Sequence, residues 1–262
     1  MGAWGSGLYS NDDAADFLDL VRPVLKLPQP IDDLVDILKA ESNDEIGDET
    51  TFWLVLADQL EKKGVHHPAT TAKAIEILEN GSDIKEMRDA GAEESDLKAR
   101  AKANLKLLDR LKNPRAEKPR TTLKKPQPAA VAVGDYVCFP TQNGSARNPY
   151  FPLGTEEFVQ TGWGLIQVYD VGWEFGYLNW VKTLPLIWAK NQPPTLKDAL
   201  RAKPSGRLAY GTLSPPHFKR MHMQVIGNAT PRTDAKPPKP YERTARFVAL
   251  NDISISNTLN GH

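Results

Sequence analysis

Twelve carboxylates lie within 38 residues near the start of this sequence, and they are its strongest signal for contact with a charged partner. They are Asp12, Asp13, Asp16, Asp19, Asp32, Asp33, Asp36, Glu41, Asp44, Glu45, Asp48 and Glu49. Only Arg22, Lys26 and Lys39 oppose them in that stretch. Such a charge run is usually a solvated face, but this density fits equally well a surface that steers and holds a basic protein. For that role we favour Asp12, Asp13, Asp16 and Asp19, and Asp32, Asp33 and Asp36 extend the set.

Aromatic side chains offer a second kind of contact. Trp4 and Tyr9 flank a glycine-rich arm, and they either pack onto the first helix or, if the arm is exposed, anchor a partner. Trp163, Trp173, Trp180 and Trp188 fall within 26 residues. With the basic stretch 112–125 they could stack on single-stranded nucleic acid. Because arginines do not alternate with these aromatics, we favour a core or interface role and expect no nucleic acid.

No residue spacing builds a recognisable catalytic, metal or cofactor site. His66 and His67 are adjacent on a turn, and His217 and His222 are five residues apart, so neither pair converges on one ion. The glycines of the arm follow no strand, as a dinucleotide-binding loop requires. Cys138 is the single cysteine, in a strand-like stretch typical of an inert buried thiol. We therefore expect a protein that is not an enzyme and holds no cofactor or metal.

Two halves of opposite charge must position these residues. Residues 1–111 hold 23 acidic and 13 basic side chains, a net charge of −10, whereas residues 112–262 hold 10 and 20, a net charge of +10. A chain of 262 residues, at roughly 100–200 residues per domain, predicts two domains. The first is expected over residues 1–112 and the second over residues 131–262. Between them, residues 113–130 contain four prolines and several cations, which predicts an extended, semi-rigid linker.

The first domain is predicted to be an irregular helical bundle. Helix starts are indicated at Ser10, Ile31, Asp48, Pro68 and Ser95, with Gly64 and Gly81 as stops. Apolar residues at helical spacing predict the buried faces. For the fourth helix they are Ala72, Ile75 and Leu78, and for the last helix they are Leu97, Ala101, Leu105, Leu108 and Leu111.

The second domain is predicted to be a β-rich α+β domain, either a small barrel or a strongly bent antiparallel sheet. Its β-rich runs, with Asn143-Gly144 as a turn, are residues 131–140, 164–171, 174–181, 186–188, 208–213, 221–226 and 246–250. One helix is expected over residues 195–202, and a Pro/Lys-rich loop over residues 228–241. The fold class is thus α+β in two domains.

The opening residues resemble an uncharacterised bacterial domain family. The run Met1-Gly2-Ala3-Trp4-Gly5 is followed by Asn11-Asp12-Asp13-Ala14 and then Asp16-Phe17, and the stretch 53–58 is similar as well. The resemblance covers about the first 80–110 residues, and it implies a small helical domain without implying any chemistry.

The second half is similar to immunity proteins of bacterial polymorphic toxin systems. The similarity lies in residues 133–140, 162–168 and 251–257. It implies a cytosolic antidote that forms a one-to-one complex with a cognate toxin and covers the toxin's active site. The acidic domain would then lie over a basic substrate-binding cleft.

Other classes of function stay open or are disfavoured. No run approaches the roughly 18–20 apolar residues of a membrane helix, and the start lacks a secretory signal pattern, so we expect a cytoplasmic protein without membrane contact. One alternative is a nucleic-acid- or ribosome-associated accessory protein that uses residues 112–125 and the tryptophans. Another is an enzyme that reverses toxin damage, although no acid/base pair of carboxylates is recognisable.

Overall fold

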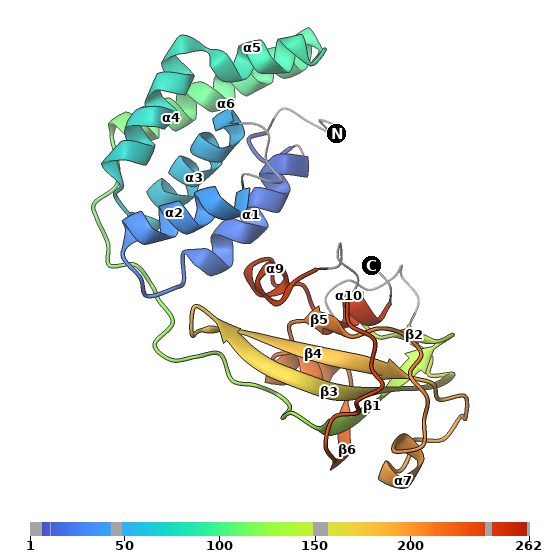
Figure 1. Ribbon diagram of the computed structural model, residues 1–262. Coiled ribbons are helices and arrows are strands. Elements are labelled where there is room, and N and C mark those ends of the chain that lie inside the picture. The colour runs from blue at the N-terminus through green and yellow to red at the C-terminus, as the bar shows by residue number, and fades with distance from the viewer. Residues whose placement is uncertain (1–6, 11, 43–48, 149–156, 239–242, 261–262) are drawn as a thin grey trace. The chain divides into compact units, whose positions relative to one another are not determined.

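The chain forms two compact units, Met1–Lys124 and Lys125–His262. The computed structural model describes residues 7–10, 12–42, 49–148, 157–238 and 243–260. Helices build the first unit, and a curled antiparallel sheet with short helices builds the second (Figure 1). The α+β class and the bent sheet expected from the sequence are confirmed. None of the described helices is both long and apolar enough to cross a membrane.

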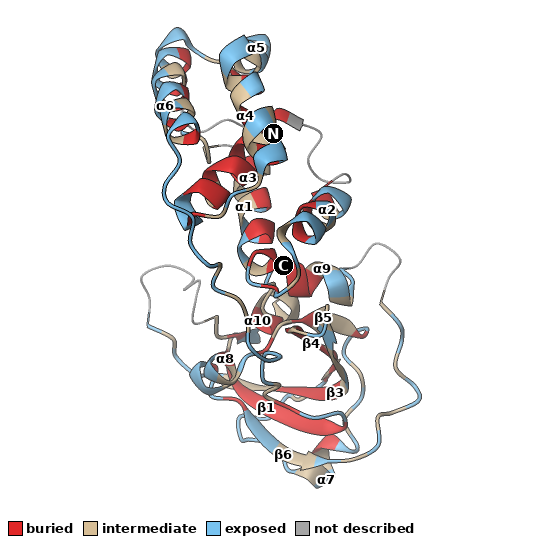
Figure 2. Cartoon of the chain, turned by 90° about the vertical axis from the view of Figure 1, so that its left-hand side faces the viewer, coloured by how far each residue is buried: buried red, intermediate tan, exposed pale blue. Residues whose placement is uncertain are grey.

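The first unit is built around α3, which packs against α1, α4, α5 and α6. Most of α3 is buried, from Thr50 to Glu61 with two half-buried positions (Figure 2). Gly64 and Gly81, with φ of 66° and 73°, end α3 and α4 in the left-handed conformation, as predicted. The helices are α1 Asp12–Val24, α2 Ile31–Ser42, α3 Glu49–Lys63, α4 Pro68–Asn80, α5 Ser82–Asp89 and α6 Glu94–Lys112.

The buried faces of α4 and α6 differ from those predicted. On α4, Ala72 is exposed, and the buried residues are Thr70, Ala74 and Ile77. On α6, Leu105 is 66% exposed. The buried positions of α6 are Leu97, Arg100, Asn104, Leu107 and Leu111. Apolar spacing predicted the wrong face of α6 because two of its buried positions hold the polar side chains of Arg100 and Asn104. The helix also begins at Glu94, so Ser95 lies inside its first turn.

Helix α5 was not predicted. Its sequence is mostly polar, and it begins directly after Gly81, which ends α4 and starts α5 at the same residue. Its buried position is Asp83, a carboxylate rather than an apolar side chain. A search for apolar periodicity therefore has nothing to detect in this segment.

The segment expected to be a linker is divided between the two units. In the first unit, the Lys118 N–H donates to the Gly64 carbonyl at 2.9 Å, and the Leu123 N–H donates to the Lys26 carbonyl at 2.7 Å. In the second unit, the Gln127 N–H donates to the Tyr177 carbonyl at 2.9 Å. Extended chain of this kind satisfies its backbone groups against a neighbouring element rather than within itself.

The sheet of the second unit has the order β2-β1-β3-β4-β5, and β6 pairs with β1. All of these pairings are antiparallel. Asn143 and Gly144, with φ of 51° and 84°, form the predicted turn between β1 and β2. The strands are β1 Asp135–Gln142, β2 Ser145–Ala146, β3 Gly162–Glu174, β4 Leu178–Leu186, β5 Ala209–Gly211 and β6 Gln224–Asn228.

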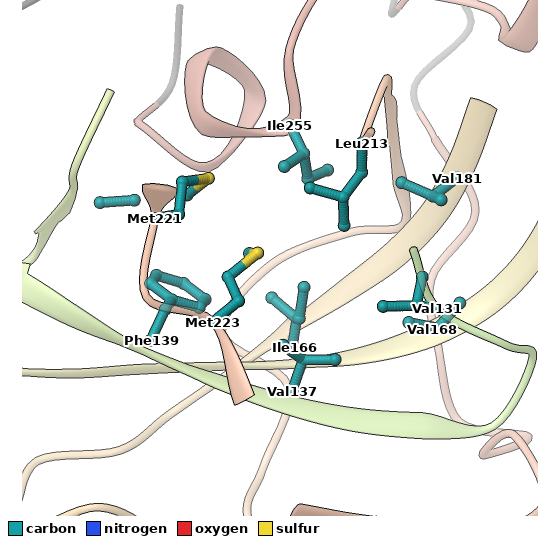
Figure 3. Packing of buried hydrophobic residues seen from close by; sticks show 11 residues of the cluster. Val131, Val137, Phe139, Ile166, Val168, Val181, Leu213, Met221, Met223 and Ile255 are labelled. Carbon is teal, nitrogen blue, oxygen red and sulfur yellow. The ribbon is translucent and has the colours of Figure 1, made fainter. Parts of the chain in front are cut away.

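Each face of this sheet carries a separate hydrophobic core. On one face, Val137, Phe139 and Ile166 point toward Met223 and Ile255 (Figure 3). On the other face, a second cluster gathers buried side chains of β1, β3 and β4 with Ala199 of α7. Successive strand residues alternate between the two faces, so both faces of β1 are apolar. The short helices are α7 Leu196–Ala199, α8 Pro215–Arg220, α9 Ala245–Leu250 and α10 Ile255–Leu259.

Two strand predictions in this unit are wrong. Residues 246–250 lie in α9, because the Thr244 hydroxyl accepts the Phe247 N–H and starts a helix there. Residues 187–188 lie outside any strand, since β4 ends at Leu186. The predicted helix over 195–202 is present in shorter form as α7, with Thr195 and Asp198 in a capping box.

Replacing Gly164 with alanine should destabilise the second unit. Gly164 lies opposite Phe139 in the β1–β3 register, and a Cβ atom there would lie 2.2 Å from the Phe139 ring. Because Phe139 is held in a packed core, we expect Gly164→Ala to lower the free energy of unfolding by about 1–3 kcal/mol. Gly206→Ala is the control, since its Cβ would meet only the Pro185 side chain at 3.9 Å. Urea unfolding that finds equal stability for both variants would contradict this packing.

Candidate functional site

Four aspartates of α1 form a like-charged row, here called the α1 acidic row: Asp12, Asp13, Asp16 and Asp19. Asp12, Asp16 and Asp19 are exposed, and their spacing places them on one face of the helix. Partial burial, followed by the charges of Asp12, Asp19 and Asp13, raises the pKa of Asp16 above its ordinary value. Arg22 Nη1 lies 2.8 Å from Asp19 Oδ1 and partly balances that end of the row, so the negative charge is concentrated around Asp16, which ionises less readily than an isolated aspartate.

The aspartates of α2 form a different arrangement. Asp32, Asp33 and Asp36 are exposed, and the first two lie in the first turn, where the helix dipole favours negative charge. Asp32 Oδ1 lies 3.0 Å from His67 Nε2. Because His67 Nδ1 accepts the Thr70 N–H at 3.2 Å, Nε2 carries the proton that is donated to Asp32. This contact ties the start of α2 to the start of α4.

Tyr9 is held inside the first unit, whereas Trp4 lies outside the described residues. The Tyr9 hydroxyl donates to Asp58 and accepts from Gln59 Nε2 at 2.6 Å. Burial, followed by the hydrogen bond and charge of Asp58, raises the pKa of Tyr9. Lys62 Nζ lies 5.1 Å from the centre of its ring. We therefore assign Tyr9 to the bundle rather than to contact with a partner.

Tyr9 belongs to a buried ionic network centred on α3. Asp58 is 1% exposed. Its carboxylate forms ion pairs with Lys62, from Nζ to Oδ2 at 2.8 Å, and with Arg110, from Nη2 to Oδ1 at 2.6 Å. The Glu61 carboxylate forms ion pairs with Arg110 Nη1 at 2.7 Å and with Arg115 Nε at 3.0 Å. Burial alone would raise the pKa of Asp58, but hydrogen bonds from Lys62, Tyr9 and Arg110 outweigh it and lower that pKa.

A second buried network joins α5 to α6. Arg100 donates two hydrogen bonds to Asp83, from Nε at 2.8 Å and from Nη2 at 2.7 Å. Asn104 Nδ2 donates to the same carboxylate at 2.6 Å. Arg100 Nη1 also donates to the Gly7 carbonyl at 2.7 Å. The two networks thus hold the described end of the arm at Gly7 and at Tyr9. Sequence reasoning missed both networks, although charged residues at helical spacing on α6 were an available signal.

His217 and Cys138 of the second unit are in structural positions. His217 is buried, with Nε2 at 3.4 Å from the Ser256 hydroxyl, and desolvation followed by the charge of Arg220 lowers its pKa to about 4. Cys138 is buried in β1, and desolvation raises the pKa of its thiol. Within the described ranges no three His, Cys, Asp or Glu side chains are grouped to hold a metal ion.

The tryptophans of the second unit lie in separate environments. Trp173 Nε1 donates to the Gln127 carbonyl at 2.7 Å, and Trp188 Nε1 donates to the Gln192 carbonyl at 2.9 Å. Trp180 meets the edge of Tyr210 with ring centres 5.6 Å apart. Trp163 packs against the core that contains Ala199. Each ring is thus engaged locally rather than stacked beside the next.

Two arginines of the basic stretch are also engaged within the first unit. Arg115 reaches Glu61, and the Arg120 guanidinium donates to the carbonyls of Leu25 and Gln29. Contacts to phosphates would have to compete with these bonds. The arrangement is therefore less favourable to nucleic-acid binding than the composition alone indicates.

Comparison with known proteins identifies the first unit only in outline. Residues 2–120 match a family described as a domain of unknown function (DUF4259). The similarity expected from the opening motif is thus shown for this part of the chain, and it brings no activity with it. No curated protein and no solved structure matches the chain.

Replacing Asp58 with asparagine should remove stability at neutral pH and not at acid pH. The lowered pKa of Asp58 means that its ionised form stabilises the folded state above about pH 4, and this contribution is lost as pH falls through the folded pKa. We expect Asp58→Asn to cost about 1.5–3 kcal/mol at pH 7, because the charge-assisted hydrogen bonds from Lys62 and from the half-buried Arg110 lose their ionised acceptor. The exposed variant Asp89→Asn is the control. Urea unfolding between pH 3 and pH 7 measures both, and a cost independent of pH would refute the ionic role.

Replacing Asp16 with asparagine should raise the free energy of unfolding at pH 7, which is the opposite of the effect expected at Asp58. A raised pKa means that ionised Asp16 is disfavoured in the folded state, so the penalty is absent below about pH 4 and grows as pH rises through the folded pKa. We expect Asp16→Asn to stabilise the unit at pH 7 by about 0.2–0.5 kcal/mol for each like-charge pair removed. Asp36→Asn on α2 is the comparison, and denaturant unfolding in low salt is the measurement. A loss of stability at pH 7 would show that the row is not repulsive.

Proposed function

We propose that this protein is an immunity protein that binds a cognate bacterial toxin domain through the α1 acidic row and blocks the toxin's active site sterically. The observation that carries the proposal is the exposure of Asp12, Asp16 and Asp19 on one face of α1, where partial burial and the neighbouring aspartates together raise the pKa of Asp16. Every charge that contributes to this shift belongs to a neighbouring aspartate of the same helix, and all of them raise it. Basic side chains of a partner would relieve this repulsion on binding.

A rigid support for the row favours inhibition by steric blockade. Behind the aspartates, α1 buries Ala14, Phe17 and Val21, and the Phe17 ring lies 4.8 Å from the Phe52 ring of α3. A helix held in this way loses little conformational entropy when a partner binds. The negative charge on its outer face would accelerate encounter with a basic cleft, and salt would weaken that effect.

The resemblance of the second half to immunity proteins supports the choice of partner. Many toxins that act on nucleic acids or phosphate-bearing cofactors have basic substrate clefts, and an acidic surface complements such a cleft. Inhibition by occlusion requires one stable complex and no turnover, so we expect a one-to-one complex with the toxin domain. The protein would then be cytoplasmic and would act without a cofactor.

The triple variant Asp12→Asn/Asp16→Asn/Asp19→Asn tests the proposal. The partner is the toxin domain encoded by the adjacent upstream gene, and association is followed by stopped flow from low to high salt. We expect the variant to associate about tenfold more slowly at low salt and to lose most of the salt dependence, because steering charge has been removed. Coexpression should show weaker protection from growth arrest.

The control carries the same change of charge on another surface of the first unit. It is Asp89→Asn/Glu93→Gln/Glu94→Gln, at three exposed positions around the start of α6. We expect it to associate as the unmodified protein does. If both triple variants associate equally slowly, the effect comes from the net charge of the protein, and the α1 acidic row is not the binding surface. Failure of the unmodified protein to bind the toxin domain or relieve its toxicity would reject the proposal.

A further inference from the structure

The second unit contains an open pocket that the acidic surface does not involve. Its volume is about 360 Å³, within the range of sites that hold one small molecule. Three of its lining residues lie in strands and are here called its floor: Pro140, Trp163 and Gln224. The other four lie outside the strands and are here called its walls: Arg147, Phe158, Gln160 and His222. These residues are far apart in the sequence, and no motif connects them.

The floor is fixed by the register of three strands. Pro140 of β1 lies opposite Trp163 of β3, and Cys138, two residues earlier on β1, lies opposite Gln224 of β6. Alternation along each strand places Pro140, Trp163 and Gln224 on the same face of the sheet. The indole of Trp163 packs against the core of that face, so it offers a firm aromatic surface at the base of the pocket.

Arg147 supplies a positive charge at the wall. Its Nη1 lies 3.3 Å from His222 Nε2, and its guanidinium carbon lies 5.7 Å from the centre of the Phe158 ring. Within the part of the chain that the structure describes, no carboxylate lies within ion-pair distance of Arg147. Because guanidinium is always charged and only donates hydrogen bonds, it is suited to a negatively charged ligand group.

His222 is held at the wall in an uncommon backbone conformation. Its φ is 53°, in the left-handed region, and it lies in the turn between α8 and β6. Such a conformation in a residue other than glycine is retained where surrounding bonds enforce it. Here the His222 N–H donates to the Lys219 carbonyl at 3.1 Å, and the Met223 N–H donates to the Phe218 carbonyl at 3.1 Å. The turn thus brings the imidazole to Arg147.

We propose that this pocket binds a nucleoside monophosphate. The phosphate would accept hydrogen bonds from Arg147 and from the Nδ1–H that His222 carries when its Nε2 accepts from Arg147. The base would lie against the rings of Trp163 and Phe158, since flat heterocycles stack on aromatic faces. The amides of Gln160 and Gln224 each offer donors and an acceptor for the edge of the base. The pocket volume of about 360 Å³ is large enough for one nucleotide and too small for a nucleic-acid chain.

The ligand class is tested with three probes on the full chain: AMP, adenosine and inorganic phosphate, each titrated by calorimetry, with UMP as a second nucleotide. Because the pocket offers both a charged wall and an aromatic floor, we expect one nucleotide to bind at one site about tenfold more tightly than adenosine or phosphate. Phosphate binding as tightly as the nucleotides would overturn the aromatic half of the proposal. Adenosine binding as tightly as AMP would overturn the anionic half, and no saturable nucleotide binding would overturn both.

The site is located with variants that keep the fold. We expect Arg147→Gln to weaken nucleotide binding about tenfold or more, and His222→Asn, which suits the left-handed backbone, to weaken it less. The matched control is Arg201→Gln, an exposed arginine outside the pocket. Equal losses in Arg147→Gln and Arg201→Gln would mean that nucleotides bind by general charge and would overturn the assignment. Circular dichroism melting verifies that each variant is folded.

Discussion

The first unit depends on the neutralisation of carboxylates that it buries. Asp58, Glu61 and Asp83 are each less than a tenth exposed, and a buried charge without a partner costs several kcal/mol. Their cations come largely from α6, through Arg100 and Arg110. Since two arginines on one helix must meet carboxylates of α5 and α3 together, the rotation and register of α6 follow from these ion pairs as much as from its leucines.

This constraint explains where sequence reasoning succeeded and where it did not. Helix positions were predictable because glycine stops and apolar spacing are local signals, and α2 begins at Ile31 as expected and buries Leu34, Val35 and Leu38 at helical spacing. The face of α6 was not predictable from apolar residues, because Arg100 and Asn104 take buried positions to reach Asp83. The identity of their partner depends on a helix, α5, whose own buried residue is that carboxylate. Such reciprocal pairing is visible only in three dimensions.

In the second unit, too, local sequence signals predicted some elements and missed features that depend on tertiary contacts. Its main strands were predictable from β-rich runs, because both faces of the sheet are apolar. The α9 segment was misassigned because its apolar run has no clear period, and the Thr244 cap decided the conformation. The pocket was missed for a related reason. Its charged wall comes from the chain after β2 and the turn before β6, which are distant in sequence and are brought together by the pairing of β1 with both strands.

The acidic row differs from the buried carboxylates in how its charge is balanced. Asp58 and Asp83 have cations placed against them in buried positions, whereas Asp19 of the row meets Arg22 in an exposed ion pair at 2.8 Å and the pKa of Asp16 is shifted by burial and by other aspartates. Like-charge pairs on a helix cost about 0.2–0.5 kcal/mol each, which a folded domain can tolerate. Close opposite charges across an interface can couple by about 1.5–7 kcal/mol. A small cost in the free protein is therefore compatible with a much larger gain in a complex, and this difference in magnitude makes the row better suited to a partner than to the fold.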